Sequence, residues 1–264
     1  MKQNPYERYR RWEPLMPVGK FVVGLLVTCG IVAVIQAAQV VAALAHGTSV
    51  TVVLDRSGGQ IQDQIAPAPL GPVVSLLTLG TGILWLIWQH KAQRDLYARG
   101  VPGLRYTPGW AVGWWFVPLA SFVLPYLCMR ELFGNAGVPA ASGMAPITRS
   151  DWRVPAWWIT YLGSSLLLVV AFVPLLRAVL ASIGDQVETN PDHVVVTISA
   201  ATIHAARLWA VVADLVKAGA AALAAWVVWT ISAREDAVVR PEAVARWSDG
   251  RAGAPPPVPP RPDL

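Results

Sequence analysis

Long stretches without charge are the feature that most limits what this chain can fold into. Five stretches contain no Asp, Glu, Lys or Arg: Phe21–Leu54, Ile65–His90, Tyr106–Met129, Val154–Leu176 and Ala218–Ala233. A helix needs roughly 20 mostly apolar residues to cross a hydrocarbon core about 30 Å thick. The first four stretches reach that length, and the fifth reaches it when the preceding residues are added. The pattern predicts an all-α, polytopic transmembrane helix bundle.

The first apolar stretch follows a basic leader, as the apolar part of a signal peptide does. A signal peptide's apolar region is about 7 to 15 residues long, whereas this stretch is much longer. We therefore expect it to remain in the protein as a membrane anchor.

The distribution of Lys and Arg separates two topologies. These residues accumulate on the cytoplasmic side of membranes. If all five stretches cross, 11 lie inside and nine outside, which is almost no bias. If the third does not cross, 17 lie inside and three outside, with Lys217 left within a helix. The charges favour four crossings with both termini in the cytoplasm, and five or six crossings are the alternative.

Tryptophan gives a second test of the same topology. Its ring prefers the membrane–water interface, where the N–H group stays hydrated. With four crossings, 10 of the 13 Trp residues lie at the cytoplasmic interface. The distribution of Lys and Arg and the distribution of Trp therefore both favour four crossings.

The third stretch, residues 108–130, has the composition of a broken helix. It contains the prolines and tryptophans Pro108, Trp110, Trp114, Trp115, Pro118 and Pro125. Each proline removes a backbone donor and disfavours straight helix. Gly109 and Gly113 form a small-xxx-small pair that allows close helix contact. We predict a re-entrant or interfacial segment, and a kinked crossing helix is the alternative.

Three regions follow along the chain. Residues 1–20 form a basic cytoplasmic N-terminal tail, and residues 21–234 form the transmembrane domain. Its helices are expected at about 21–45, 70–90, 108–130 (broken), 154–177 and 191–234. The last begins where Asn190-Pro191-Asp192 resembles a helix start. Residues 235–264 are rich in proline and are expected to form a disordered tail.

Two ionisable residues fall within a predicted span. Asp214 and Lys217 are spaced i, i+3 and can pair on one helix face. Ionisable groups in a membrane suggest an ion or proton relay. The charge-free stretch after Lys217 is about 24 Å long at 1.5 Å per residue, so Lys217 lies near the outer boundary and can reach water. This favours a structural pair, and a relay is the alternative.

The pattern of the remaining polar residues indicates contact with lipid headgroups rather than a catalytic or metal-binding site. Arg94, Arg99 and Arg105 follow the second helix, where they would meet anionic headgroups on the cytoplasmic side. That role explains the net charge of +5 without a nucleic-acid partner. The chain contains no phosphate-loop, nucleophile-elbow or metal-ligand motif. We expect no cofactor, no metal and no enzymatic activity.

The central block of the sequence resembles a known family. The residues that carry the resemblance are Trp88, Lys91, Arg94, the Pro108–Pro118 segment, Pro125 and Met129-Arg130-Glu131-Leu132. They are similar to the bacterial membrane family called domain of unknown function 4328, over roughly residues 20–236. Arg outnumbers Lys by 17 to 4, which is typical of an actinobacterial member. The resemblance implies no activity.

These observations lead to two functional hypotheses. The first is a non-enzymatic protein of the bacterial inner membrane that contacts lipids, a partner protein or a second copy of itself. The second is a small channel or transporter that uses residues 108–130 and the pair Asp214 and Lys217. The two differ in whether polar residues from several helices converge beside Pro118 and Pro125.

Overall fold

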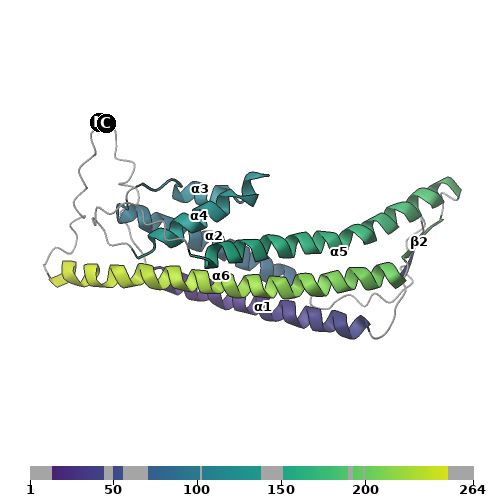
Figure 1. The fold of residues 1–264 in the computed structure, drawn as a ribbon, viewed down its shortest axis with the longest axis horizontal. Coiled ribbons are helices and arrows are strands. Elements are labelled where there is room, and N and C mark those ends of the chain that lie inside the picture. Colours follow the sequence, from purple (N-terminus) through teal and green to yellow (C-terminus); the bar gives the residue numbers. More distant parts are fainter. Residues whose placement is uncertain are drawn as a thin grey trace. The chain divides into compact units, whose positions relative to one another are not determined.

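The protein is almost entirely helical in the part of the chain that its structure describes (Figure 1). The computed structural model describes residues 14–44, 50–55, 71–101, 103–137, 151–189, 193–198 and 200–248. Its long helices are α1 (Met16–Leu44), α2 (Gly71–Ala98), α5 (Arg153–Thr189) and α6 (Ala200–Ser248). The predicted all-α helix bundle is confirmed.

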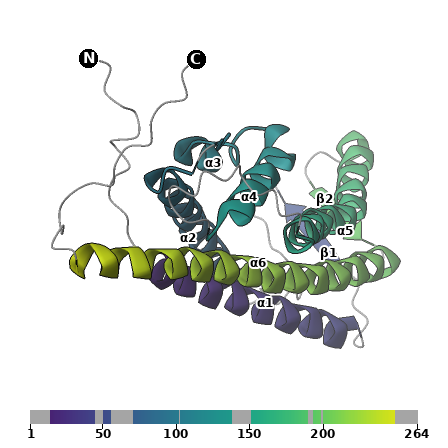
Figure 2. The same cartoon turned by 60° about the vertical axis from the view of Figure 1, so that its left-hand side comes forward.

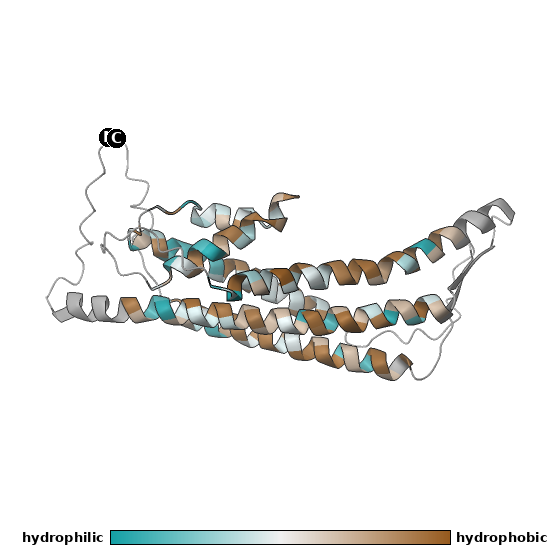
Figure 3. Ribbon diagram, viewed as in Figure 1, coloured by the Kyte–Doolittle hydropathy of each residue, from teal (hydrophilic) through white to brown (hydrophobic). Residues whose placement is uncertain are grey.

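Four helices are long and apolar enough to cross a membrane. The candidate spans are Met16–Ala42, Pro72–Ala98, Arg153–Ala181 and Ala201–Val238. Apolar residues predominate along all four helices (Figure 3). In α5 only 11% of the most apolar window is buried within the protein, so most of its apolar side chains face outward, as contact with lipid requires. By length and composition, the four predicted crossing helices are confirmed.

The third apolar stretch is broken into short elements, as predicted. They are α3 (Pro108–Gly113), the 3₁₀ turn η2 (Ala120–Phe122) and α4 (Leu124–Asn135). Thr107 caps α3, because its hydroxyl oxygen accepts from the N–H of Trp110 at 3.4 Å. Pro118 lies in the irregular connection, where it cannot continue a helix. Pro125 lies in the first turn of α4, where a missing donor costs nothing.

A two-stranded antiparallel ribbon was not predicted. Strand β1 (Val50–Asp55) pairs with β2 (His193–Ile198), in a register that joins Val50 to Ile198 and Asp55 to His193. The expected helix start near 191 is therefore wrong, and α6 begins at Ala200. Both strands are rich in valine and threonine, whose branched side chains fit a pleated surface better than a helix.

The helices also extend beyond their predicted ends. Helix α1 begins at Met16, α2 continues to Ala98 and α5 continues to Thr189. Helix α6 continues to Ser248, so the tail predicted from residue 235 is wrong up to that point. The rest of that tail, residues 249–264, and residues 1–13 of the N-terminal tail lie outside the described residues.

The chain divides into two compact units, which are described separately here. Unit 1 comprises residues 1–27, 78–158 and 222–264, and unit 2 comprises residues 28–77 and 159–221. Unit 1 holds 17 Lys and Arg against 10 Asp and Glu, a net charge of +7, whereas unit 2 holds four against six, a net charge of −2. Unit 1 also holds 12 of the 13 Trp residues. The chain's basic and aromatic residues are thus concentrated in one unit.

Each unit has its own packing. In unit 1, the buried core includes Trp88 and Leu96 from α2, Leu132 and Phe133 from α4, and Ile231 from α6. In unit 2, α1 and α6 approach closely. A side chain added at Gly30 would lie 3.6 Å from both the Ala218 carbonyl oxygen and the Ala221 side chain. This close approach agrees with the packing that small residues allow in membrane helices.

Candidate functional site

Polar side chains of α2 hold the backbone of the broken segment within unit 1. Helices α3 and α4 lie beside the C-terminal part of α2 (Figure 2). Gln89 is buried, and its Nε2 donates to the carbonyl oxygen of Ala111 at 3.2 Å, while its Oε1 accepts from Trp115 Nε1 at 2.9 Å. His90 Nδ1 lies 3.1 Å from the carbonyl oxygen of Pro108. One turn of α2 therefore binds both ends of α3.

Glu131 closes the base of the broken segment. This half-buried carboxylate in α4 accepts from the backbone N–H of Arg105 at 2.8 Å and from that of Tyr106 at 3.3 Å. Gln93 Nε2 donates to Glu131 at 3.0 Å and to the Tyr106 carbonyl oxygen at 2.8 Å. The residues before α3 and the end of α4 are thus fastened to each other and to α2. The segment is a helical hairpin, which we call the 108–135 hairpin.

A strained turn reverses the chain within this hairpin. Leu119 has φ 64° and ψ −46°, and the N–H of Ala120 donates to the carbonyl oxygen of Pro118 at 2.7 Å. This is a three-residue γ-turn of the rare, strained form, which for a leucine costs about 1–3 kcal/mol. Leu119 is nevertheless 82% exposed, and Phe116 is 71% exposed. The strain presents apolar side chains outward.

Indole rings fill the space between the hairpin and its neighbours in unit 1. Trp158 Nε1 donates to the Phe122 carbonyl oxygen at 3.1 Å. The rings of Trp85, Trp115, Trp158 and Trp157 contact one another in a closed circuit, with centroids 5.2–6.4 Å apart. At these spacings the four rings pack against one another as an aromatic cluster.

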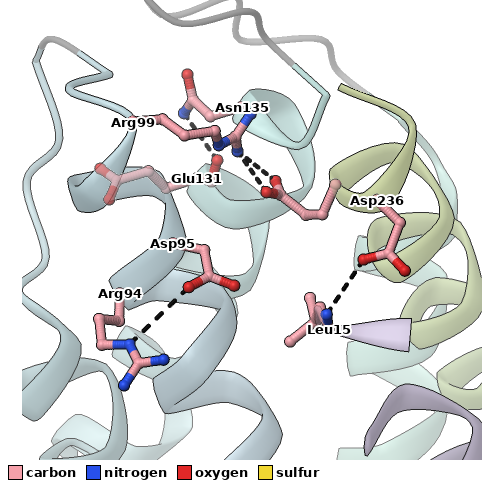
Figure 4. Close-up of polar contacts among 8 residues, drawn as sticks. Leu15, Arg94, Asp95, Arg99, Glu131, Asn135 and Asp236 are labelled. Atoms are coloured by element: carbon pink, nitrogen blue, oxygen red, sulfur yellow. Dashed lines mark hydrogen bonds and ion pairs between the residues drawn. The ribbon is translucent and has the colours of Figure 1, made fainter. Parts of the chain in front are cut away.

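A buried ion pair joins α6 to the residue that follows α2. Arg99 donates from one nitrogen to both carboxylate oxygens of Glu235, at 2.6 and 2.5 Å (Figure 4). Only 2% of each side chain is exposed. The carboxylate also interacts with the negative charge of Asp95 and receives a backbone hydrogen bond from Gly137. Arg99 therefore balances the charge of Glu235 in the interior of unit 1.

The start of α1 is fastened to the same part of α6. The Leu15 N–H donates to Asp236 at 3.1 Å (Figure 4). One turn away, Gly19 approaches Ser232 so closely that an added side chain would clash with the serine oxygen. That oxygen accepts from Trp88 Nε1 at 3.1 Å. Three helices thus meet at one glycine and one serine.

Comparison with known protein families identifies the chain. The profile of one family, Domain of unknown function (DUF4328), matches residues 62–233. The chain belongs to this family. Comparisons with curated proteins and with solved structures gave no significant match. The DUF4328 match contains the 108–135 hairpin and the glutamines that hold it. Glu235 and Asp236 follow the end of the match.

The structure of this DUF4328 member brings several of the sequence-predicted residues together. Trp88 is buried in the core, and Arg94 is mostly buried, with its Nε 3.9 Å from Asp95. Pro108, Trp115 and Glu131 take part in the hairpin contacts described above. Four others lie partly or fully at the surface: Trp110, Trp114, Pro118 and Arg130. Pro125 is buried at the start of α4.

Two of the sequence interpretations are wrong. Gly109 has open space where its side chain would be, and Gly113 would meet only the ring of Trp110, so neither makes a close helix contact. They instead lie in a short helix that is held through its backbone. Arg99 was expected to meet lipid headgroups, but it is buried with Glu235. Arg105 is exposed, as that role requires.

Asp214 and Lys217 lie in unit 2, apart in sequence and in unit from the hairpin. Asp214 is half-buried and interacts with the charge of Lys217, which is exposed. This electrostatic attraction is what a self-neutralising pair would use.

Three polar residues that hold unit 1 together were not predicted. Gln89 and Gln93 were overlooked, although glutamines at i, i+4 at the end of an apolar helix indicate a polar stripe. Glu235 was assigned to a disordered tail because it follows the last apolar stretch. Its partner is Arg99, which follows α2, and spacing along the chain does not reveal such a distant pair.

Among the described residues, no group of three or more His, Cys, Asp or Glu could hold a metal ion. Cys128 in α4 is buried, and burial, with the nearby charge of Glu131, raises the pKa of its thiol to about 12. A thiol with that pKa is protonated at neutral pH and is a poor nucleophile.

Proposed function

We propose that this DUF4328 protein is a non-enzymatic scaffold of the bacterial inner membrane, which acts through lipid headgroups and partner proteins at the cytoplasmic face. The observation that carries the proposal is the charge of the two units, +7 for unit 1 and −2 for unit 2. The cytoplasmic leaflet is anionic, and each Lys or Arg near it contributes about 1 kcal/mol of attraction. Unit 1 therefore belongs at that face.

The use of polar groups within unit 1 supports a structural role over transport. In transporters, broken helices bind ions or substrates with the carbonyl groups of unwound backbone. Here the Ala111 carbonyl oxygen accepts from Gln89, and that of Phe122 accepts from Trp158. These carbonyl groups already have donors within the protein, which counts against a channel that uses them to bind ions.

Lipid retention tests the proposal. The protein is purified in a mild detergent, and the bound phospholipids are extracted and the amount of each headgroup class is measured. We expect anionic lipid to be enriched and to be lost at high salt, because salt screens exposed charges. Replacing the exposed Arg105 and Arg130 by glutamine removes two contacts of about 1 kcal/mol each, which lowers anionic-lipid affinity by about 30-fold.

The matched control is Arg177→Gln, which removes an exposed arginine from unit 2 and should leave lipid retention unchanged. Proton and cation flux is measured in the same preparation after reconstitution in liposomes. Flux that the wild-type protein carries and Asp214→Asn abolishes would contradict the scaffold and favour transport. Equal retention of anionic and zwitterionic lipids would contradict the lipid contact.

A further inference from the structure

The connection between α3 and α4 forms an exposed apolar surface, which we call the hairpin tip (residues 116–123). Its exposed side chains are Phe116, Val117, Leu119, Phe122 and Val123. In Figure 3 this connection is coloured as apolar. A cluster of this kind marks a site that contacts a membrane or another protein.

The backbone of the tip is built to present this surface. The γ-turn at Leu119 holds a leucine in a conformation that leucines rarely adopt, and its side chain is the most exposed of the large apolar side chains in the described part of the chain. A strained residue persists only where its surroundings favour it. Water gives no such benefit to an exposed leucine, whereas hydrocarbon does.

Polar and charged residues lie at the other end of the hairpin. Glu131 fastens the hairpin base by accepting the backbone N–H of Arg105, and it directly follows Arg130 in α4. Both arginine side chains are exposed. The hairpin therefore has cationic residues at its base and apolar residues at its tip, the order that headgroups and acyl chains follow in one leaflet.

The length and the hydrogen bonding of the hairpin also suit a leaflet. Arg130 lies six residues after Leu124, the first residue of α4, so the two are about 9 Å apart along the helix at 1.5 Å per residue. A tip at that depth below the headgroups stays within one leaflet of a hydrocarbon core about 30 Å thick and does not cross it. Backbone groups at membrane depth need partners within the protein. The contacts of Gln89 with Ala111 and of Trp158 with Phe122 provide them.

We propose that the 108–135 hairpin is a re-entrant wedge, which inserts its tip into the acyl chains of the anionic leaflet while Arg105 and Arg130 contact the headgroups. This deepens the proposed function, on which it rests, by assigning the lipid contact to one element. The occupant of the tip is phospholipid. A partner protein or a second copy of the chain would be a different outcome of the test below.

Single cysteines test the wedge in a background of Cys29→Ser and Cys128→Ala. Leu119→Cys reports on the tip and Arg130→Cys on the base, and both native side chains are exposed, so only a membrane distinguishes them. The protein is placed in detergent or in liposomes of phosphatidylcholine and phosphatidylglycerol. Because a thiol in hydrocarbon stays protonated and out of reach, a membrane-impermeant maleimide should label position 119 at least about tenfold more slowly in liposomes than in detergent. Position 130 should change by less than about twofold, because it remains in water.

Nitroxide labels at the same positions identify the occupant. At position 119 we expect high accessibility to oxygen, which dissolves in lipid, and low accessibility to a water-soluble nickel complex. Access to nickel would place the tip in water, and access to neither would mean that a protein covers it. Each result overturns the wedge. Labelling of Arg105→Cys and Arg130→Cys from opposite sides of the liposome would overturn it as well, because the segment would then cross.

The experiments can contradict the wedge proposal and the scaffold proposal independently of each other. If anionic lipid is retained while position 119 stays in water, the wedge is wrong and the proposed function stands. If position 119 lies in lipid while the protein carries ions, the wedge stands and the scaffold is wrong.

Discussion

The Arg99–Glu235 pair gives the sharpest test of how unit 1 is held together. The two side chains are each 2% exposed and joined by two short hydrogen bonds. Removing one partner leaves a buried charge without compensation, which costs about 3–5 kcal/mol. We therefore expect Glu235→Gln to lower the free energy of unfolding by about 3 kcal/mol.

Arg99→Met should cost less than Glu235→Gln. The carboxyl group that Arg99→Met leaves behind can take up a proton and become neutral, whereas Glu235→Gln leaves a buried guanidinium that stays charged. The order of the two single variants is thus set by which of the two groups can lose its charge.

The double variant Arg99→Met, Glu235→Leu separates the pair from its surroundings. Replacing a buried ion pair by apolar residues of similar volume is often close to neutral. The double variant should therefore be more stable than the sum of the single changes by at least about 2 kcal/mol. Unfolding is measured by titration with sodium dodecyl sulfate in mixed micelles, with tryptophan fluorescence as the signal.

This reasoning would be refuted if the double variant lowered the free energy of unfolding by the sum of the two single changes. Such additivity would mean that Arg99 and Glu235 contribute independently. A cost below about 1 kcal/mol for either single variant would be typical of a solvated surface pair, and would contradict the burial. Arg177→Gln, which removes an exposed arginine from unit 2, is the control and should change the free energy of unfolding by less than about 0.5 kcal/mol.

Three further changes test other contacts of unit 1. Replacing Gln89 by leucine makes α2 more apolar, yet should destabilise the protein by about 1–3 kcal/mol in the same unfolding assay, because the Ala111 carbonyl loses its donor; no loss would mean that this contact does not hold the hairpin. Gly137→Ala should cost about 1–2 kcal/mol, since φ is +82° and the new side chain would lie 3.1 Å from Arg234, whereas Gly109→Ala, with open space around it, should be close to neutral; equal costs would contradict this. The pKa of Cys128 is raised, so the folded state keeps the proton: stability is unaffected below the unfolded pKa near 9 and falls between pH 9 and about 12. In a Cys29→Ser background, the thiol should therefore resist iodoacetamide at pH 8 until the protein is unfolded.

The long apolar helices were predictable because a bilayer imposes their length and composition. The crossing helices must be apolar along about 20 residues, so α1, α2 and α5 follow directly from stretches without charge. The break in the third stretch was predictable for a similar reason. Proline removes a donor wherever it stands, and Pro118 has no compatible place inside a straight helix.

The contacts of the site could not be predicted in the same way. The Asn190-Pro191-Asp192 sequence resembles a helix start, and that local signal concealed the strand at His193–Ile198, whose partner is β1. The ion pair of Glu235 could not be predicted from the local sequence either, since its partner Arg99 is 136 residues away. Local patterns report on the bilayer and on the backbone. They do not report on which distant side chain completes a buried pair.

The polar residues of α2 and the prolines of the hairpin are related through the hydrogen bonding of the backbone. A chain that unwinds at membrane depth exposes backbone groups that lipid cannot satisfy. The prolines cause the unwinding, and Gln89, Gln93 and Trp158 supply the donors that it demands. Neither set is favourable alone, because buried glutamines without partners would destabilise a spanning helix. The Trp/Pro-rich block and the glutamines of α2 are therefore two parts of one structural device, and both fall within the region that defines DUF4328.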